Sequence, residues 1–256
     1  MKKPNAISRN SSLMTKCPVF AICAGVSLVQ PVPAAVIDLF SAPQDPVSVV
    51  LPNPGSPPAS SSSSMSDPGI LGLERDIIVN VNVAGGFQSG ISASVSDGSL
   101  LYSTTGSFGA SGSAQIQWDG VDGSAALNPV GLGGIDLTSG SQTAFRLVVQ
   151  STIAGANLGL TVYSDAIRAS SITFQTGMVL ASQDFFLRYS DFTPVLGTGA
   201  DFSNVGAVTF TRFYGAADPV RFDGLETVTM VPEPSVVSFG ALVAALGLVR
   251  RRRRCE

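Results

Sequence analysis

The sequence contains no histidine, and its cysteines and lysines are absent from the middle of the chain. The cysteines are Cys17, Cys23 and Cys255, and the last lysine is Lys16. Between residues 35 and 230 there is therefore no disulfide, no thiolate or imidazole zinc site, no Cys-His nucleophile pair and no Ser-His-Asp triad.

Basic charge is also scarce in this stretch. Residues 35–230 hold six arginines against sixteen aspartates and glutamates, and charged residues make up only 13% of the chain. A body with this charge balance does not attract a phosphate backbone, so nucleic acid is excluded as a partner. Abundant glycine, serine and threonine, with few lysines and glutamates, favour an all-β fold.

Residues 1–34 have the pattern of a secretory signal peptide. A basic region through Lys16 precedes the apolar stretch CPVFAICAGVSLV, and small residues allow cleavage after about Ala34. A retained membrane anchor is the alternative, although an apolar run of about 13 residues is closer to a signal-peptide core than to a spanning helix of about 20. We expect export through the secretory translocon and cleavage by signal peptidase.

Residues 35–69 are dense in proline and serine. Such a composition buries too little apolar surface to offset the entropy lost on ordering. It predicts a flexible, partly polyproline-like spacer, most clearly from Phe40 to Gly69.

Residues 70–230 are predicted to form one β-sandwich domain. In the stretch DIIVNVNVA, Ile77, Val79, Val81 and Val83 share one face, which is the period-two pattern of a half-buried strand. Similar short runs recur between Asp-Gly, Gly-Gly and Ser-Gly turns, and no amphipathic helix interrupts them. Nine or ten strands predict an antiparallel β-sandwich of the jelly-roll kind. A β-solenoid is the alternative, but the sequence has no repeat of fixed period.

Acid-base catalysis would depend on carboxylates, because histidine is missing. A glycosidase needs two of them flanking one sugar bond, and the body offers only two glutamates, Glu74 and Glu226. The sequence does not place them opposite each other, so we expect no catalytic residues and no enzyme activity.

Two acidic stretches are candidate calcium sites, because calcium prefers clustered oxygen ligands. WDGVDGS contains Asp119 and Asp122, and FDGLE contains Asp223 and Glu226. Neither matches an EF-hand loop, and Asp-Gly pairs more commonly form turns. No other cofactor is expected.

Trp118, the only tryptophan, is a candidate platform for stacking a sugar. Strand alternation favours a core position instead, because Ala114, Ile116 and Trp118 share a face while the glutamines between them point the other way.

The last 26 residues combine a short turn, an apolar run and a basic cluster. The run from residue 236 to 249 contains no charge and is followed by five arginines: Arg250, Arg251, Arg252, Arg253 and Arg254. These features predict a short C-terminal transmembrane helix with its arginines on the cytoplasmic side, the orientation that the signal peptide also predicts. Fifteen residues from Ser235 reach only about 22 Å against about 30 Å of hydrocarbon, which suits a temporary anchor.

The segment 231–256 resembles the PEP-CTERM sorting signal of exported bacterial proteins. The resemblance rests on Val231, Pro232, Glu233 and Pro234 standing just before an apolar helix and an arginine cluster. It implies that an exosortase-type membrane enzyme processes the tail after the protein has been held briefly in the inner membrane. Two prolines also hold Glu233 in an extended, accessible segment.

Together these features predict a secreted, non-enzymatic protein of the cell surface or extracellular matrix, including biofilm. The alternative is a carbohydrate-binding module that acts on extracellular polysaccharide.

Overall fold

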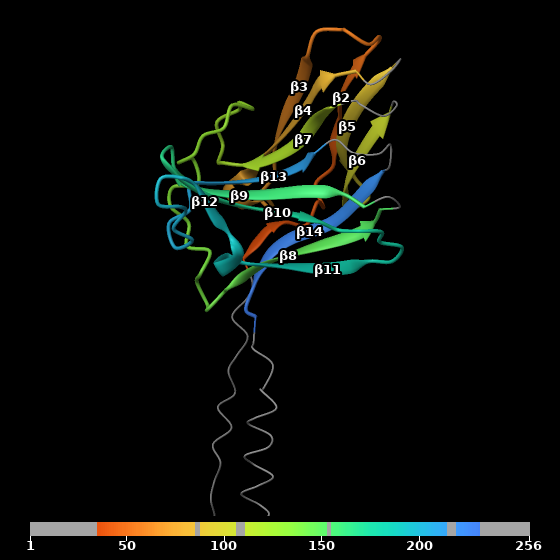
Figure 1. Cartoon of the computed structure of the whole chain (residues 1–256). Helices are drawn as coiled ribbons and strands as arrows, with labels where there is room; N and C mark the ends of the chain where they lie inside the picture. The colour runs from red at the N-terminus through yellow and green to blue at the C-terminus, as the bar shows by residue number, and fades with distance from the viewer. Residues whose placement is uncertain (1–34, 85–87, 106–110, 153–154, 214–218, 231–256) are drawn as a thin grey trace, which may run out of the picture. The chain divides into compact units, whose positions relative to one another are not determined.

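The computed structural model describes residues 35–84, 88–105, 111–152, 155–213 and 219–230, and this part of the chain is all β. Its fourteen strands form two seven-stranded antiparallel sheets (Figure 1). Two short 3₁₀ helices occur along the chain, η1 (Leu71–Leu73) before β4 and η2 (Tyr189–Asp191) after β11. The predicted antiparallel β-sandwich is confirmed, and its strand order is like that of a jelly roll.

Sheet A has the order β11-β8-β14-β6-β5-β2, and β1 also pairs with β14. Its strands are β1 (Val36–Asp38), β2 (Gln44–Leu51), β5 (Ser89–Ser96), β6 (Ser99–Thr105), β8 (Ala144–Ser151), β11 (Gln183–Arg188) and β14 (Val220–Val228).

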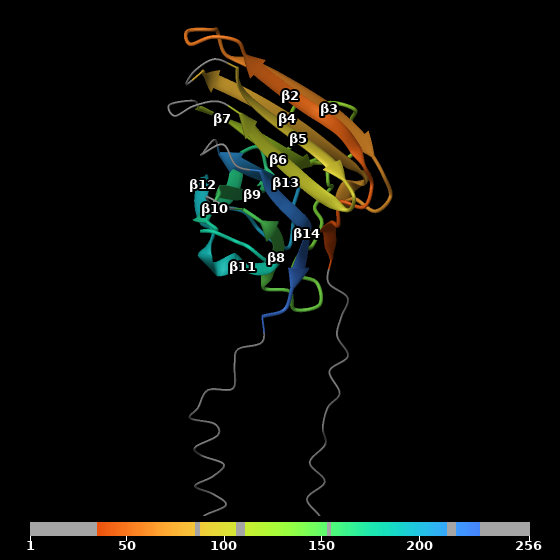
Figure 2. The same cartoon turned by 90° about the vertical axis from the view of Figure 1, so that its right-hand side faces the viewer.

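Sheet B has the order β12-β10-β9-β13-β7-β4-β3 (Figure 2). Its strands are β3 (Ala59–Ser66), β4 (Glu74–Val83), β7 (Ser111–Trp118), β9 (Asn157–Asp165), β10 (Arg168–Gln175), β12 (Thr193–Leu196) and β13 (Ala207–Phe213).

The core lies between the two sheets and follows the predicted alternation. Ile77, Val79 and Val81 of β4 are buried beside Ile116 of β7, and sheet A contributes aromatic and aliphatic side chains from its inner face. The pattern ends earlier than predicted, because Val83 is half exposed at the end of its strand. Burying one large apolar side chain contributes about 1.5–3 kcal/mol, so this inner layer dominates the stability of the domain.

The prediction of a flexible spacer over residues 35–69 is wrong, because β1, β2 and β3 lie within it. Val47, Val49 and Leu51 alternate into the core from β2. The serine-rich strand β3 needs little apolar surface because it is an edge strand that pairs along its whole length with β4. The sandwich therefore begins at β1 and not at residue 70.

A buried ion pair fixes the start of the domain to sheet B. Nη1 of Arg75 lies 2.8 Å from Oδ2 of Asp38, and both side chains are almost completely buried. The same guanidinium donates to Oε1 of Gln44 at 2.8 Å and to the carbonyl oxygen of Ala42 at 2.7 Å. All three partners belong to the segment that the composition had suggested was unstructured.

The predicted transmembrane helix falls in residues 231–256, outside the described part of the chain. Among the residues that the structure does describe, no helix is long and apolar enough to cross a membrane.

Candidate functional site

The predicted sorting residues, from Val231 to Pro234 and from Arg250 to Arg254, lie outside the described residues, as does the predicted signal peptide. Trp118 is fully buried, as strand alternation predicted. Its indole Nε1 donates a hydrogen bond to Asp38 inside the core, so Trp118 is not available as a sugar platform.

The two acidic stretches considered as calcium sites lie on different sheets. Asp119 directly follows β7 of sheet B and Asp122 lies in the loop after it, whereas Asp223 and Glu226 lie in β14 of sheet A. Asp223 accepts a hydrogen bond from Ser99, and Glu226 pairs with Arg146 at 2.6 Å. No three His, Cys, Asp or Glu side chains in the described ranges surround a common metal position.

The two glutamates considered for catalysis are also apart. Glu74 is buried on the outer side of sheet B, where it accepts hydrogen bonds from Gly123 N and the Ser66 hydroxyl. Glu226 is partly exposed on sheet A and is held by Arg146. A pair of carboxylates flanking one glycosidic bond requires a separation of roughly 5–10 Å, which residues on the outer faces of two stacked sheets do not provide.

The outer face of sheet B, called the polar face below, carries continuous rows of hydroxyl and amide side chains. Cross-strand partners point to the same side of a sheet, so the strand register defines each row. One row crosses all seven strands: Ser64, Asp76, Gln117, Thr209, Thr161, Ser171 and Thr193. It includes one carboxylate, and its members Asp76, Gln117 and Thr209 are buried. Six spacings of about 4.8 Å give this row a length of about 29 Å.

The next two rows toward the pocket contain no charged residue. The first consists of Ser62, Ile78, Gln115, Thr211, Gly159 and Thr173. The second contains Ser60, Asn80, Ser113 and Phe213, and farther along it the partners Asn157 and Gln175. Threonine suits such positions because its branched side chain packs well on a pleated surface while its hydroxyl remains outside.

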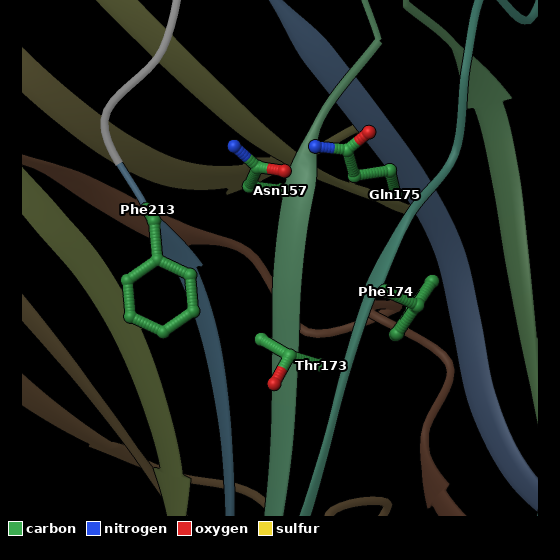
Figure 3. Close-up of a pocket in the computed structure, with 5 residues that line it drawn as sticks. All are labelled: Asn157, Thr173, Phe174, Gln175 and Phe213. Atoms are coloured by element: carbon green, nitrogen blue, oxygen red, sulfur yellow. The ribbon is translucent and has the colours of Figure 1, made fainter.

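A pocket of about 310 Å³ opens on this face at the ends of β9, β10 and β13 (Figure 3). Its lining residues are Asn157, Thr173, Phe174, Gln175 and Phe213. Figure 3 shows the two amide groups near each other at one end, and the Phe213 ring and the Thr173 side chain farther along the pocket.

Gly159 allows the Phe213 ring to lie against β9. A Cβ atom at Gly159 would come within 3.2 Å of Cε2 of Phe213, closer than ordinary contacts allow. The ring stays 43% exposed, so an apolar surface is offered among groups that donate and accept hydrogen bonds. Neutral ligands with an apolar ring face and many hydroxyls match this combination.

Sequence reasoning missed these pocket residues. Alternation in the stretch AVTFTRF already separates Thr209, Thr211 and Phe213 from the buried Val208 and Phe210. It does not reveal that β9 and β10 bring Asn157 and Gln175 to the same place, because that depends on the order of strands in sheet B.

Comparison with known proteins gives distant structural matches only. No family model matches the sequence, and no curated protein matches it. A family 11 carbohydrate-binding module from Clostridium thermocellum, solved with a β-1,3-1,4-mixed-linked tetrasaccharide, has a TM-score of 0.41 at 10% identity, covering 78% of this chain and 98% of the module.

Two further structures give similar results. The family 11 carbohydrate-binding module of a cellulosomal cellulase of Clostridium thermocellum has a TM-score of 0.40 at 9% identity, covering 80% of this chain and 99% of its own. A family 29 carbohydrate-binding module has a TM-score of 0.34 at 9% identity, covering 75% and 97% of the two chains. Matches this remote do not identify a ligand, and the site described above rests on its own geometry.

Proposed function

We propose that this chain is an exported, non-enzymatic protein whose sandwich binds extracellular polysaccharide through the polar face of sheet B. The observation that carries this proposal is the exposed Phe213 ring beside the amides of Asn157 and Gln175. An aromatic ring packs against the C–H face of a sugar, while amides and hydroxyls exchange hydrogen bonds with its hydroxyl groups.

The absence of charge from the two rows nearest the pocket favours a neutral glycan over an anionic one. Serine, threonine, asparagine and glutamine both donate and accept hydrogen bonds, as sugar hydroxyls do. The exposed and half-exposed side chains of these two rows, such as Gln115, Thr211 and Thr173, offer repeated contacts to an extended chain. Repeated weak contacts along one face suit a polymer better than a single small molecule.

The test is binding of the purified protein to a panel of neutral and anionic polysaccharides, measured by glycan array and then by calorimetry. We expect saturable binding to a neutral glycan, weakened about tenfold or more by Phe213→Ala. Phe186→Ala is the matched control, because Phe186 is similarly exposed, at 47%, but lies on β11 of sheet A. If no glycan binds, or if both variants weaken binding equally, the proposal fails.

The C-terminal segment supports a second, compatible function in sorting. We propose that the translocon and signal peptidase export the protein, and that an exosortase-type enzyme recognises Val231, Pro232, Glu233 and Pro234. Arg250 to Arg254 would hold the tail in the inner membrane until processing, after which the domain reaches the cell surface or the extracellular space.

Intact-mass measurement of the mature native protein tests both ends together. We expect a mass that lacks residues 1–34 and the tail. Glu233→Ala, or deletion of the five arginines, should change that mass or leave the protein in the inner membrane. An intact tail in a strain that has the processing enzyme would contradict the sorting proposal.

A further inference from the structure

Three neighbouring side chains on sheet B form a buried cluster of oxygen acceptors. Asp76 of β4 and Gln117 of β7 are direct cross-strand partners, and Asp119 follows two residues after Gln117 on the same side. Asp76 and Asp119 are completely buried, and Gln117 is 5% exposed.

Four oxygen atoms of this cluster accept no hydrogen bond of good geometry in the described part of the chain, although the Ser64 hydroxyl and the Asp119 carboxyl lie near enough to interact with Asp76. The four atoms are both carboxylate oxygens of Asp76, Oε1 of Gln117 and Oδ1 of Asp119. The remaining oxygen of Asp119 accepts from the backbone N–H of Asn128 at 2.6 Å. Buried acceptors of this kind are rare unless a proton, water or ion satisfies them.

Negative charge gathers around the same point. The carboxylate of Glu74 lies close enough to interact electrostatically with both aspartates, and Asp122 acts on Asp119. Arg75, between Glu74 and Asp76 in sequence, points to the opposite side of the sheet and is committed to Asp38. None of the described salt bridges involves Asp76 or Asp119.

The loop after β7 covers the cluster and is held close to it. A Cβ atom on Gly131 would overlap the carbonyl oxygen of Asp119, and one on Gly120 would overlap the carbonyl oxygen of Gly131. The backbone of the loop therefore approaches β7 more closely than residues with side chains would allow. The loop also donates hydrogen bonds to the cluster and to its neighbour Glu74, from Asn128 N to Asp119 and from Gly123 N to Glu74.

Burial, with smaller contributions from the neighbouring Asp119 and Glu74 charges, raises the pKa of Asp76 to about 7, against the lowering effect of a hydrogen bond from the Ser64 hydroxyl. Burial likewise raises the pKa of Asp119. Both pKa values are raised because no positive group among the described residues lies beside these buried carboxylates to stabilise their charged form.

We propose that Asp76, Gln117 and Asp119 bind a divalent cation of the calcium class. Two carboxylates and one amide supply only hard oxygen ligands, which suit calcium and do not suit zinc or copper. Calcium accepts six to eight oxygens in flexible geometry, so backbone carbonyls and waters complete its shell. The cation would join the loop after β7 to strands β4 and β7, and its binding is independent of glycan binding.

The experiment uses the purified full chain, first stripped with EDTA. Calcium chloride is added in a calorimeter and in thermal melts, with magnesium chloride as a second arm. We expect a saturable heat and a rise in Tm of several degrees with calcium, and a smaller response to magnesium, which demands a tighter octahedral shell.

Terbium gives an independent readout, because it replaces calcium and luminesces when a nearby tryptophan is excited. The chain has one tryptophan, Trp118, directly before Asp119 in sequence. We expect sensitised terbium emission that added calcium displaces.

Asp76→Asn and Asp119→Asn should each weaken calcium binding about tenfold or more. Asp97→Asn is the matched control, since Asp97 lies exposed in the turn between β5 and β6 of sheet A, and it should keep the response. Gln117→Glu adds a carboxylate to the cluster and should tighten calcium binding, so the proposal does not depend on variants that lose function.

No heat, no change in Tm and no terbium emission from a folded wild-type protein would overturn the proposal and indicate a proton shared between the two aspartates. Calcium binding that survives Asp76→Asn and Asp119→Asn unchanged would also overturn it.

Discussion

The indole Nε1 of Trp118 donates a hydrogen bond of 3.1 Å to Oδ2 of Asp38, the same oxygen that Arg75 contacts at 2.8 Å. Three buried groups from β1, β4 and β7 thus meet at one atom, and the first strand of the domain is bound to sheet B through it. Because the only tryptophan serves this contact, replacing it would damage the fold before it tested any ligand.

Asp38→Asn is expected to reduce the free energy of unfolding by about 3–5 kcal/mol, because it leaves the buried guanidinium of Arg75 without its counter-charge. Urea denaturation followed by tryptophan fluorescence measures the effect. Asp184→Asn is the control, since the Asp184–Arg146 pair is partly exposed and its loss should cost about 1 kcal/mol or less. Equal effects of the two substitutions would contradict this account of the core.

Gly159→Val should lower the affinity for glycan while the domain stays folded. The new side chain would occupy the space that the Phe213 ring covers and would push the ring off β9. Valine is otherwise well tolerated in a strand, so the melting temperature should change little. Calorimetric titration with the best polysaccharide from the panel measures the effect, and Ser92→Val on β5 of sheet A serves as the control. If Gly159→Val binds glycan with unchanged affinity, the Phe213 ring does not contribute to the binding site.

Glycan affinity should be almost independent of salt. The rows of the polar face beside the pocket contain no charged residue, so binding there has no ionic interaction for salt to screen. We expect less than about a twofold change in Kd between about 0.05 M and about 0.5 M sodium chloride. A steep fall in affinity with salt would instead point to the Arg146 and Arg221 side of sheet A and to an anionic ligand.

The metal-free protein should lose stability as the pH rises from about 4 to about 7. The pKa of Asp76 is raised to about 7 in the folded state, chiefly by burial, from an ordinary value near 4 in the unfolded chain. Between these values the folded state binds more protons than the unfolded state, so the free energy of unfolding falls with increasing pH. Denaturation in EDTA at several pH values measures this slope, which Asp76→Asn should flatten. A stability that rises through this range in both proteins would contradict the assignment.

Alternation along single strands made the core predictable. It correctly predicted that Ile116 and Trp118 are buried. It also predicted the sandwich, because the apolar face of an antiparallel sheet packs on a core, which a second sheet completes here. It failed for β3, whose serines pair with β4 through the backbone and need no apolar side chains to do so.

The pocket and the acceptor cluster depend on register between strands that are distant in sequence. Asp76 and Gln117 became neighbours only through the pairing of β4 with β7, and Phe213 reached Gly159 only through the pairing of β13 with β9. The stretch WDGVDGS did draw attention to Asp119, but toward Asp122 in its own loop instead of across the sheet. Local spacing holds no information about such contacts.

The position of the last two strands determines when the domain can fold. β13 lies inside sheet B between β7 and β9, and β14 lies inside sheet A between β6 and β8. Until synthesis has passed residue 213, sheet B is therefore in two separate halves. The same holds for sheet A until synthesis has passed residue 228, and before then β1 lacks its partner β14. A nascent chain that crosses a membrane from its N-terminus would stay unfolded almost to its end, and the sandwich would close only as the segment carrying Pro232 and Glu233 arrives.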